Sequence, residues 1–336
     1  MSPLMRARFQ RFQQNKLGFR CLILFLIIFL FSLMAGLIAN DKPLLIRYKH
    51  AFYLPILQDY PETTFGGEFE TAADYQDPAV QQLIQKKGWM ITPWVPFSYQ
   101  TPNLALAVPV PSPPTSQNWL GTDDQGRDVF ARILYGLRVS LIFGFALTFC
   151  SAVIGIMVGA IQGYYDGWMD LIGQRILEVW GGLPMLFIVM ILVSMFSPSV
   201  YWLFLIMLLF GWTELVGLVR AEFLRARNFD YVRAAHALGV SDHKIIFKHI
   251  LPNALSSSLS QIPFMLTANI IALTALDFLG YGLPPDAASL GELLLQGKNN
   301  LDAPWLVISG FVALAIVLSL LIFIGEAARD AFDPRQ

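Results

Sequence analysis

Residues 139–161 read VSLIFGFALTFCSAVIGIMVGAI, a run of 23 residues without any Asp, Glu, Lys or Arg. A helix of about 20 apolar residues crosses the hydrocarbon core of a bilayer, so this run predicts a transmembrane helix. The whole chain agrees, because 55% of its 336 residues are hydrophobic and only 14% are charged. A soluble domain has about 25% charged residues and a disordered chain has few apolar ones, so both classes are excluded. The net charge of −1 gives no indication of a nucleic-acid partner and leaves a lipid bilayer as the predicted surroundings.

Five more apolar runs lie on either side of this one, and each contains at most one charged residue. They are residues 21–39, 176–196, 200–219, 257–281 and 305–325. Each is long enough to cross a bilayer as a helix. The sequence therefore predicts an all-α integral membrane fold with about six transmembrane helices.

The Lys and Arg residues near these runs predict the orientation, since cytoplasmic loops are enriched in them. Residues 1–20 carry five basic side chains and no acidic one, and residues 220–255 carry six basic against three acidic. We therefore expect both segments in the cytoplasm, together with the tail 326–336 after the sixth helix. The long segment 40–138 carries eight basic and ten acidic residues and is expected on the periplasmic side. The five helices within 139–325 would then form the core around the cytoplasmic loop 220–255.

The run at 21–39 has an alternative interpretation, because a basic start followed by apolar residues also occurs in cleaved signal peptides. Its 19 apolar residues exceed the length of a signal-peptide core, which is about 7–15 residues. Ile38-Ala39 offers only a weak cleavage site. A retained membrane anchor is therefore favoured.

Residues 40–117 are polar, aromatic and rich in proline, as in the stretch PVPSPP at 109–114. Proline spaced in this way favours an extended chain that packs on other surfaces. The segment is either a small folded cap or an irregular connector, and a connector without chemistry of its own is favoured.

A helical pattern begins at Asp128 and ends the 40–138 segment. One face of it holds Val129, Phe130, Ile133, Leu134 and Leu137. The pattern predicts an interfacial helix that lies at the membrane surface before the run at 139–161. Asp123, Asp124 and Asp128 suggest a calcium loop, but an EF-hand loop from Asp123 would need Glu at 134, where this chain has Leu. These acids are interpreted as turn and helix-start residues.

The predicted cytoplasmic loop contains the most informative stretch, DYVRAAHALGVSDHKIIFKHILPN at 230–253. One helical stripe, at i, i+3, i+4 and i+7, is formed by Tyr231, Ala234, Ala235 and Leu238. Gly239 suits the position just after a helix, and Ser241 suits the start of a second short helix. Pro252 is expected to end that second helix. The stretch therefore predicts a helix, a sharp turn and another helix.

Three of the four histidines lie in this loop, at His236, His243 and His249. Their spacings of seven and six residues do not bring them together on one helix. Solvent-facing histidines are favoured over a metal site, and no metal site is predicted. The two cysteines, Cys21 and Cys150, both lie in apolar runs and form no disulfide framework.

The stretch at 230–253 resembles the EAA loop of permease subunits in ABC importers. That pattern has an acidic residue and two alanines, then Gly four positions after the second alanine, then Leu-Pro near the end. The matching residues are Ala234, Ala235, Gly239, Leu251 and Pro252. Arg233 stands where the pattern has the acid, so a salt bridge through an acidic side chain at that position is not expected.

Several other stretches resemble motifs of the dipeptide/oligopeptide type, second permease subunit. They are LGTDDQGRD at 120–128, GYY at 163–165 with Gly167, FLGYGLPP at 278–285, SLGE at 289–292, APWL at 303–306 and GEAARDAFDPR at 325–335. The long segment 40–117, with LDFLG at 276–280 and LLQGKNN at 294–300, is similar to YejE-type subunits. Such subunits belong to importers of peptides and of the peptide-nucleotide antibiotic microcin C.

This resemblance implies a multi-pass permease of a bacterial inner membrane with no catalytic activity of its own. Its partners would be a second permease subunit in a heterodimer, a cytoplasmic ABC ATPase and a periplasmic peptide-binding protein. The implied ATPase-coupling residues are Tyr231, Arg233, Ala234, Ala235, Leu238, Gly239, Ser241, Leu251 and Pro252. ATP and Mg would bind to the ATPase, because Gly297-Lys298 has Glu292 in place of the first Gly of a phosphate loop and is followed by Asn299. This chain is expected to hold no cofactor.

Asp277 stands near the expected outer end of the fifth helix, where the broader family commonly has a serine. An ionised acid inside a bilayer usually faces protein or water, so Asp277 is a candidate for the transport pathway, in contact with a peptide's amino end. A hydrogen bond between helices is the alternative role for this side chain.

Two other function classes are weaker alternatives. A secondary transporter would carry its own coupling acids and inverted repeats, but no clear repeat relates the two halves of this sequence. A membrane sensor would need a signalling output, which the 11 residues after Gly325 do not provide. An importer subunit is the favoured prediction.

Overall fold

The computed structural model describes residues 3–104, 106, 108–196 and 199–332, and most of these residues are helical. Residues 197–198, between the apolar runs 176–196 and 200–219, and the end of the 326–336 tail lie outside the described residues. The chain divides into two compact units. The first unit combines Met1–Ile27, Ser140–Pro284 and Ala315–Gln336, and the second combines Ile28–Val139 and Pro285–Leu314.

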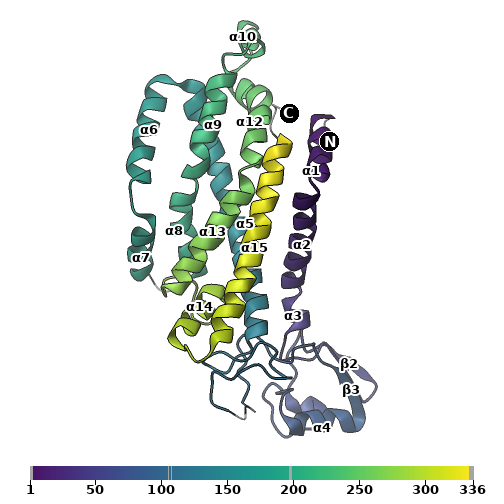
Figure 1. The fold of residues 1–336 in the computed structure, drawn as a ribbon. Helices are drawn as coiled ribbons and strands as arrows, with labels where there is room; N and C mark the ends of the chain where they lie inside the picture. The colour runs from purple at the N-terminus through teal and green to yellow at the C-terminus, as the bar shows by residue number, and fades with distance from the viewer. Residues whose placement is uncertain (1–2, 105, 107, 197–198, 333–336) are drawn as a thin grey trace. The chain divides into compact units, whose positions relative to one another are not determined.

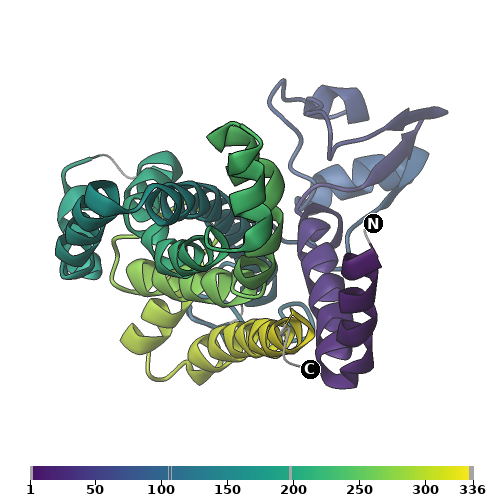
Figure 2. The same cartoon turned by 90° about the horizontal axis from the view of Figure 1, so that it is seen from above.

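The first unit is a bundle of helices, seen end on in Figure 2 from teal to green. Figure 1 shows α10 at the free end of α9 and α12. The helices that lie in this unit are α1 (Pro3–Gln14), α6 (Gly167–Gly181), α7 (Met185–Ser194), α8 (Val200–Gly211), α9 (Thr213–Ala226), α10 (Asp230–Ala237), α11 (Asp242–Lys244), the π-helix η2 (Ile245–Ile250), α12 (Leu251–Leu259) and α13 (Ile262–Phe278). Three helices have residues in both units, namely α2 (Lys16–Leu33), α5 (Val129–Tyr165) and α15 (Pro304–Phe332).

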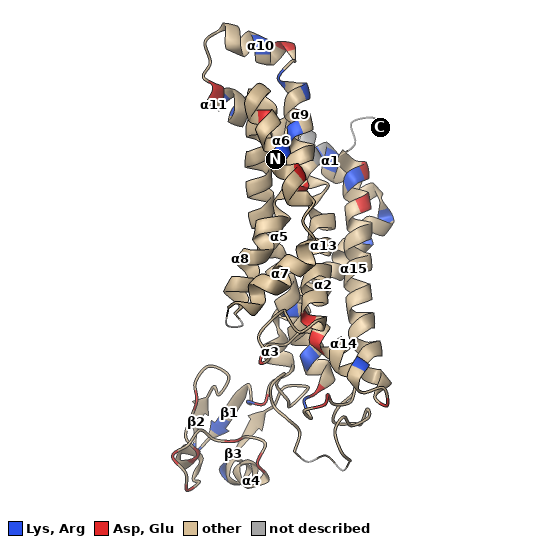
Figure 3. Cartoon of the chain, turned by 90° about the vertical axis from the view of Figure 1, so that its left-hand side faces the viewer, with Lys and Arg blue, Asp and Glu red and all other residues tan. Residues whose placement is uncertain are grey.

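The described residues contain four helices that are long and apolar enough to cross a membrane. They are Lys16–Leu33, Val129–Tyr165, Val200–Ala226 and Pro304–Phe332. A fifth is added if α6 and α7 form one bent span, and α13 is a shorter apolar helix. Figure 3 shows long stretches of α8, α13 and α15 without charged residues. The chain is therefore a multi-pass membrane protein.

The apolar run at 176–196 does not form the single continuous helix that its composition suggested. α6 ends at Gly181, α7 begins at Met185, and the two helices are bent by 74°. Gly182, Leu183 and Pro184 occupy the break. Proline lacks the N–H that would continue the helix and disfavours helical geometry in the residue before it, which explains why the helix breaks here.

The expected separate helix at the membrane surface is also absent from the described residues. Residues 129–138 form the first turns of α5, which continues unbroken for 37 residues. The apolar face that suggested an interfacial helix is buried instead, with Val129 and Leu134 at 0% and 5% exposure. The periodicity of this face was recognised correctly, but the surface that covers it is protein.

Three glycines of α5 allow α9 to approach its backbone closely. A Cβ at Gly155 would lie 2.5 Å from the Trp212 carbonyl oxygen, and one at Gly159 would lie 2.7 Å from that of Val216. A Cβ at Gly163 would lie 2.5 Å from the carbonyl oxygen of Arg220. Glycines at a spacing of four share one helix face, and such small-residue faces are the usual site of close helix contact in membranes. The contact thus fixes α9 against α5 at three successive points, over about two turns of helix.

The second unit contains a small sheet, so the expectation of an all-α fold was wrong in this segment. The strands β1 (Leu45–Tyr48), β2 (Ala51–Tyr53) and β3 (Gly88–Ile91) form an antiparallel sheet in the order β2-β1-β3. The other elements of this unit are α3 (Ala35–Ile38), the 3₁₀ helix η1 (Glu62–Phe65), α4 (Pro78–Lys87) and α14 (Leu290–Asn299). Ile46 pairs with Tyr53 on one side and Met90 on the other.

A compact apolar core holds this sheet together. Its buried members are Ile46, Tyr48, Phe65, Tyr75, Val80 and Ile84. Asp77 caps α4 by accepting a hydrogen bond from the Ala79 N–H at 2.8 Å, and Pro78 occupies the first turn. Residues 45–91 therefore form a small folded subdomain, which is the first of the two expected alternatives. The proline-rich composition gave no period from which these short strands could be predicted.

Replacing Gly159 with leucine is expected to lower the thermal stability of the detergent-purified protein by about 1–3 kcal/mol, because the new side chain must displace the α9 backbone. Gly217→Leu is the matched control, since no described atom lies within 4 Å of a Cβ at that position of α9. Thermal unfolding followed by circular dichroism measures both. Equal melting temperatures for the two variants would contradict the close α5–α9 contact.

Candidate functional site

The stretch at 230–253 begins with a short helix that ends in a well-formed turn. α10 stops at Ala237, and Gly239 follows with φ of +75°. The Gly239 N–H donates to the His236 carbonyl at 2.9 Å, and the Val240 N–H donates to the Ala235 carbonyl at 3.1 Å. These two hydrogen bonds define a Schellman motif, in which a glycine is favoured because it adopts positive φ without strain.

The second half of the stretch continues as one helix beyond the point where it was expected to stop. Ser241 stands at the N-cap of α11, although no side-chain capping bond from it is found among the described residues. Residues 245–250 form a π-helix, in which the Leu251 N–H bonds to the Ile246 carbonyl five residues back. Pro252 lies in the first turn of α12, where a proline needs no N–H partner, so it does not end the helix.

The inner face of this helical loop is buried in the core of the first unit. From the loop, Val232, Ala235, Ile245, Ile246 and Ile250 join the same apolar cluster as Ala160 and Tyr164 of α5 and Val219, Phe223 and Ala226 of α9. Interiors packed in this way resist deformation. The loop is therefore a rigid extension of α5 and α9 rather than a mobile connection.

The outer face of the loop presents large apolar side chains to the surroundings. Leu238 is 83% exposed, Phe247 is 59% exposed and Tyr231 is 42% exposed. We call these three residues the outer face. The predicted stripe is divided between the two faces, because Ala235 turns inward while its other members are exposed. Phe247 was not recognised from the sequence, although an aromatic residue among the lysines and histidines of a loop was a usable signal.

The remaining predicted coupling residues surround the outer face. Arg233, Ala234, Gly239, Ser241 and Pro252 are all exposed, and Leu251 is half-buried. Figure 3 marks basic and acidic residues in colour on and beside α9, α10 and α11. Among the residues that the structure describes, no group of His, Cys, Asp or Glu could hold a metal ion.

Two ion pairs join α9 to the corner between α5 and α6. Arg220 holds Asp170 with both nitrogens of its fork, and Nη2 lies 2.6 Å from Oδ2. Arg227 Nη2 lies 2.6 Å from Asp166 Oδ2, and this hydrogen bond lowers the pKa of Asp166. A bidentate arginine–carboxylate pair is strong and directional, so Arg220 and Asp170 fix the orientation of α6 relative to α9.

Tyr164, near the end of α5, bonds to both halves of the loop. Its hydroxyl donates to Asp242 Oδ1 at 2.7 Å and lies 3.0 Å from His236 Nε2. Neither interaction was predicted, and His236 was expected to face only solvent. The sequence did contain signals for these contacts. Tyr164 lies within one of the recognised motifs, and Asp170 and Arg220 are isolated charges close to apolar runs, where a charge needs a partner.

Asp277 is 6% exposed near the end of α13. Its Oδ1 accepts a hydrogen bond from the Leu283 N–H at 2.6 Å, so the carboxylate organises the turn that follows the helix. A role for Asp277 in the transport pathway stays a prediction.

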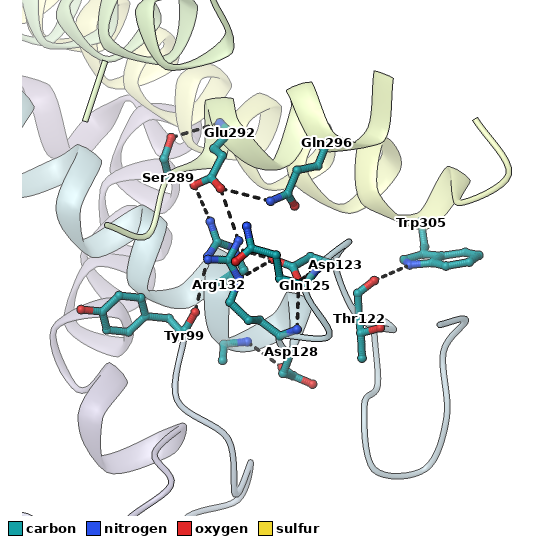
Figure 4. Close-up of polar contacts among 12 residues, drawn as sticks. Tyr99, Thr122, Asp123, Gln125, Asp128, Arg132, Ser289, Glu292, Gln296 and Trp305 are labelled. Atoms are coloured by element: carbon teal, nitrogen blue, oxygen red, sulfur yellow. Dashed lines mark hydrogen bonds and ion pairs between the residues drawn. The ribbon is translucent and has the colours of Figure 1, made fainter. Parts of the chain in front are cut away.

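Three of the sequence motifs meet in the second unit, as Figure 4 shows. They are the loop at 120–128, the start of α14 at 289–292 and the start of α15 at 303–306. Arg132 of α5 is fully buried, and its Nη2 lies 2.6 Å from Glu292 Oε2. Asp123 Oδ2 lies 2.7 Å from Arg127 Nε and 3.4 Å from Arg132 Nε. We call these four side chains the motif cluster, in which two arginines face two carboxylates.

Further hydrogen bonds extend the motif cluster on both sides. The Trp305 indole N–H donates to the Thr122 carbonyl at 3.2 Å, which ties α15 to the loop. Asn118 donates to Asp128 at 2.7 Å, and burial raises the pKa of Asp128. Asp123 accepts hydrogen bonds from the Gln125 and Arg127 N–H groups, and Asp128 accepts one from the Ala131 N–H. These two acids therefore hold a turn and a helix start, as interpreted from the sequence, and the motif cluster joins them to α14.

Replacing Arg132 with methionine is expected to destabilise the protein by about 3–5 kcal/mol, because Glu292 and Asp123 lose a buried partner. Lys42→Met is the matched control in the same unit, since the side chains of the Lys42–Asp59 pair are 40% and 64% exposed. An exposed pair contributes at most about 1 kcal/mol. Unfolding in denaturant measures both, and similar losses for the two variants would contradict a structural motif cluster.

Comparison with known proteins gives consistent results. Residues 140–336 match the family described as binding-protein-dependent transport system inner membrane component. The chain is 56% identical to the inner membrane ABC transporter permease protein YejE of Escherichia coli K12, over 100% of this chain and 98% of that protein. It is 48% identical to the peptidoglycan transport system permease protein YejE of Agrobacterium fabrum, over 100% and 94%. The oligopeptide transport system permease protein OppC of Haemophilus influenzae is 34% identical over 73% of this chain and 79% of its own length.

Proposed function

Since this chain belongs to the family of binding-protein-dependent transport system inner membrane components, we propose that it is the permease subunit of an ATP-driven importer of peptides or peptide-like compounds. The resemblance to peptide-type permeases, recognised from sequence motifs, is confirmed by the relatives. The observation that carries the proposal is the loop at 230–253. Its inner face is fixed in the core, while Tyr231, Leu238 and Phe247 face outward.

In this proposal the chain crosses the bacterial inner membrane six times. α6 with α7 supplies one crossing and α12 with α13 supplies another, in addition to the four long apolar helices. Both termini and the loop at 220–255 are cytoplasmic, which the excess of Lys and Arg in residues 1–20 and 220–255 supports. Residues 40–138 are periplasmic.

A cytoplasmic ABC ATPase binds the outer face of the loop and supplies the ATP and Mg chemistry. Exposed apolar side chains of this size are typical of protein-binding surfaces. Closure of the ATPases moves the loop as a rigid lever, because its inner face is packed against α9 and α5. The attached helices α9 and α12 then tilt, which switches access to the pathway from outside to inside.

A second permease subunit completes the pathway as a heterodimer, and a periplasmic binding protein delivers the cargo. Relatives named for oligopeptide and for peptidoglycan transport support peptides and peptide-like compounds as the cargo class. We include microcin C in that class on the resemblance to YejE-type subunits alone. Asp277 is proposed to contribute to the pathway near the outer end of α13, through the turn that its carboxylate organises.

The test is gentle detergent purification of the tagged chain from its own membranes, with identification of every co-purifying subunit. We expect an ATPase and a second permease in stoichiometric amounts. A lone homo-oligomer that is indifferent to ATP would contradict the proposal and favour a secondary transporter.

Replacing Gly239 with valine is expected to reduce peptide uptake by about tenfold while membrane insertion is retained. A β-branched residue at positive φ costs roughly 1–2 kcal/mol, and in the open space around Gly239 this cost is conformational rather than steric. The distorted turn would misplace Leu238 next to it.

The matched control is Gly239→Asn, because asparagine tolerates the left-handed region. Uptake of labelled peptide by cells, normalised to the amount of chain in the membrane, measures both variants. Normal uptake with Gly239→Val would contradict the role of the loop as a lever.

A further inference from the structure

α6 is attached to the rest of the first unit in an unusual way. Of its 15 residues, all of which the structure describes, Asp170 alone is buried. Most of its apolar side chains face outward, with Trp168 at 77% and Val179 at 70% exposure, whereas Trp180 at its other end packs against an apolar cluster and donates a hydrogen bond to the Leu209 carbonyl of α8. Near its N-terminal end, α6 is therefore held by a carboxylate rather than by an apolar face. Figure 1 shows α6 along one side of the bundle.

The helix after the bend is attached in the opposite manner. Val189 of α7 is fully buried in an apolar cluster with Leu203 and Met207 of α8. The 74° bend between the two helices contains Gly182 and Pro184. Hydrogen bonds from the Gly182 N–H to the Glu178 carbonyl and from the Leu183 N–H to the Trp180 carbonyl carry α6 into the bend, but Pro184 has no N–H with which to continue the ladder. α6 can therefore pivot at this end, where Trp180 and α7 are both retained by α8.

The corner that leads into α6 is strained. Asp166 has φ of +53° and ψ of −163°, a conformation that strongly favours glycine. An aspartate persists there because Arg227 holds its carboxylate at 2.6 Å. Strained residues persist where the surroundings over-determine them, and they are concentrated at sites that move or switch.

Both carboxylates of this region are held from the same helix. Arg220 and Arg227 lie on α9 and at its end, where the apolar inner face of the coupling loop also packs. Any displacement of the loop displaces α9, and α9 carries both guanidinium groups with it. Because the Arg220–Asp170 pair is bidentate, a rotation of the guanidinium group also rotates the carboxylate, and a translation carries it along.

We propose that Asp170 and Asp166 are positioning residues that transmit the movement of the coupling loop to α6, which turns about residues 181–184 while α7 stays with α8. The inference rests on the proposed function, because the loop moves only if an ATPase acts on it. It adds α6, which is not next to the loop in the sequence, to the helices that the loop moves.

The first measurement uses the complex that co-purifies with the chain, reconstituted in liposomes with its binding protein. Asp170→Asn and Arg220→Met are expected to keep ATP hydrolysis. The amount of labelled trialanine transported per ATP hydrolysed is expected to fall about fivefold or more, because coupling between two sites usually changes affinity or activity by at least that factor. Asp170→Glu, which keeps the charge, is expected to recover at least half of the loss. Arg225→Met is the matched control, because the Arg225–Glu222 pair is formed within α9.

The second measurement is a distance between spin labels at Met169→Cys on α6 and Ile191→Cys on α7, after replacement of Cys21 and Cys150. Both labelled side chains are exposed, at 58% and 60%. The distance is expected to differ between nucleotide-free and ATP-bound complexes, and the difference is expected to shrink with Asp170→Asn. This readout needs no cargo, so it tests the inference even if trialanine is not transported.

The outcomes separate the two proposals. If the wild-type complex hydrolyses ATP but the label distance is constant, the movement of α6 is contradicted and the proposed function stands. Unchanged transport per ATP with Asp170→Asn would also overturn the inference, as would an equal loss of ATP hydrolysis and transport. If no ATPase co-purifies with the chain, the proposed function fails instead.

Discussion

At Gly155, Gly159 and Gly163 the backbone of α5 lies against carbonyl oxygens of α9, at distances that leave no room for a side chain. A gap of about 0.5–1 Å between packed atoms already loses a quarter to a half of their dispersion attraction, so two helices in this contact move as one body. The coupling loop depends on this pair, because its inner apolar residues pack partly on α5 and partly on α9. If α9 were free to slide on α5, displacement of the loop would be absorbed between them.

Attachments of two kinds divide the first unit into parts that stay together and parts that can move. Apolar packing joins the loop to α9 and α7 to α8, and Trp180 joins the end of α6 next to the bend to α8. The start of α6 is held instead through Asp170, and its strained corner through Asp166. An apolar interface loses contact area when it shifts, and so it favours a single arrangement. A bidentate arginine–carboxylate pair is directional, so it passes a displacement of α9 on to the start of α6. The first unit therefore has rigid apolar contacts near the lever and a directional polar link beside it.

Periodicity and composition were sufficient to predict the parts of the fold that repeat. Apolar length predicted the long helices α5 and α15, and Gly239 marked the turn of the loop correctly. The bend at Pro184 and the π-helix before Pro252 could not be predicted in the same way. In both cases the proline signal was present, but its effect depends on whether neighbouring turns break or widen.

The coupling residues were predicted as a set, but their directions and partners were not. A spacing of i, i+3, i+4 and i+7 identifies a helix face without stating what covers it, so Ala235 could not be separated from Leu238. Tyr164 and Asp242 are 78 residues apart, and only the close packing of α5 and α9 brings them together. The sequence alone does not indicate that these two residues are close in space.

The motif cluster explains why the sequence identified the family more readily than the cargo. Asp123, Arg132 and Glu292 come from two motifs and the helix between them, and their charges are used on one another. A buried charge without a partner is costly, so any change at one of these positions requires a change at another. Such residues identify a family because they hold its structure together. Residues that contact cargo are under no comparable constraint from the fold. The motifs therefore identify the family but do not indicate which peptide is transported.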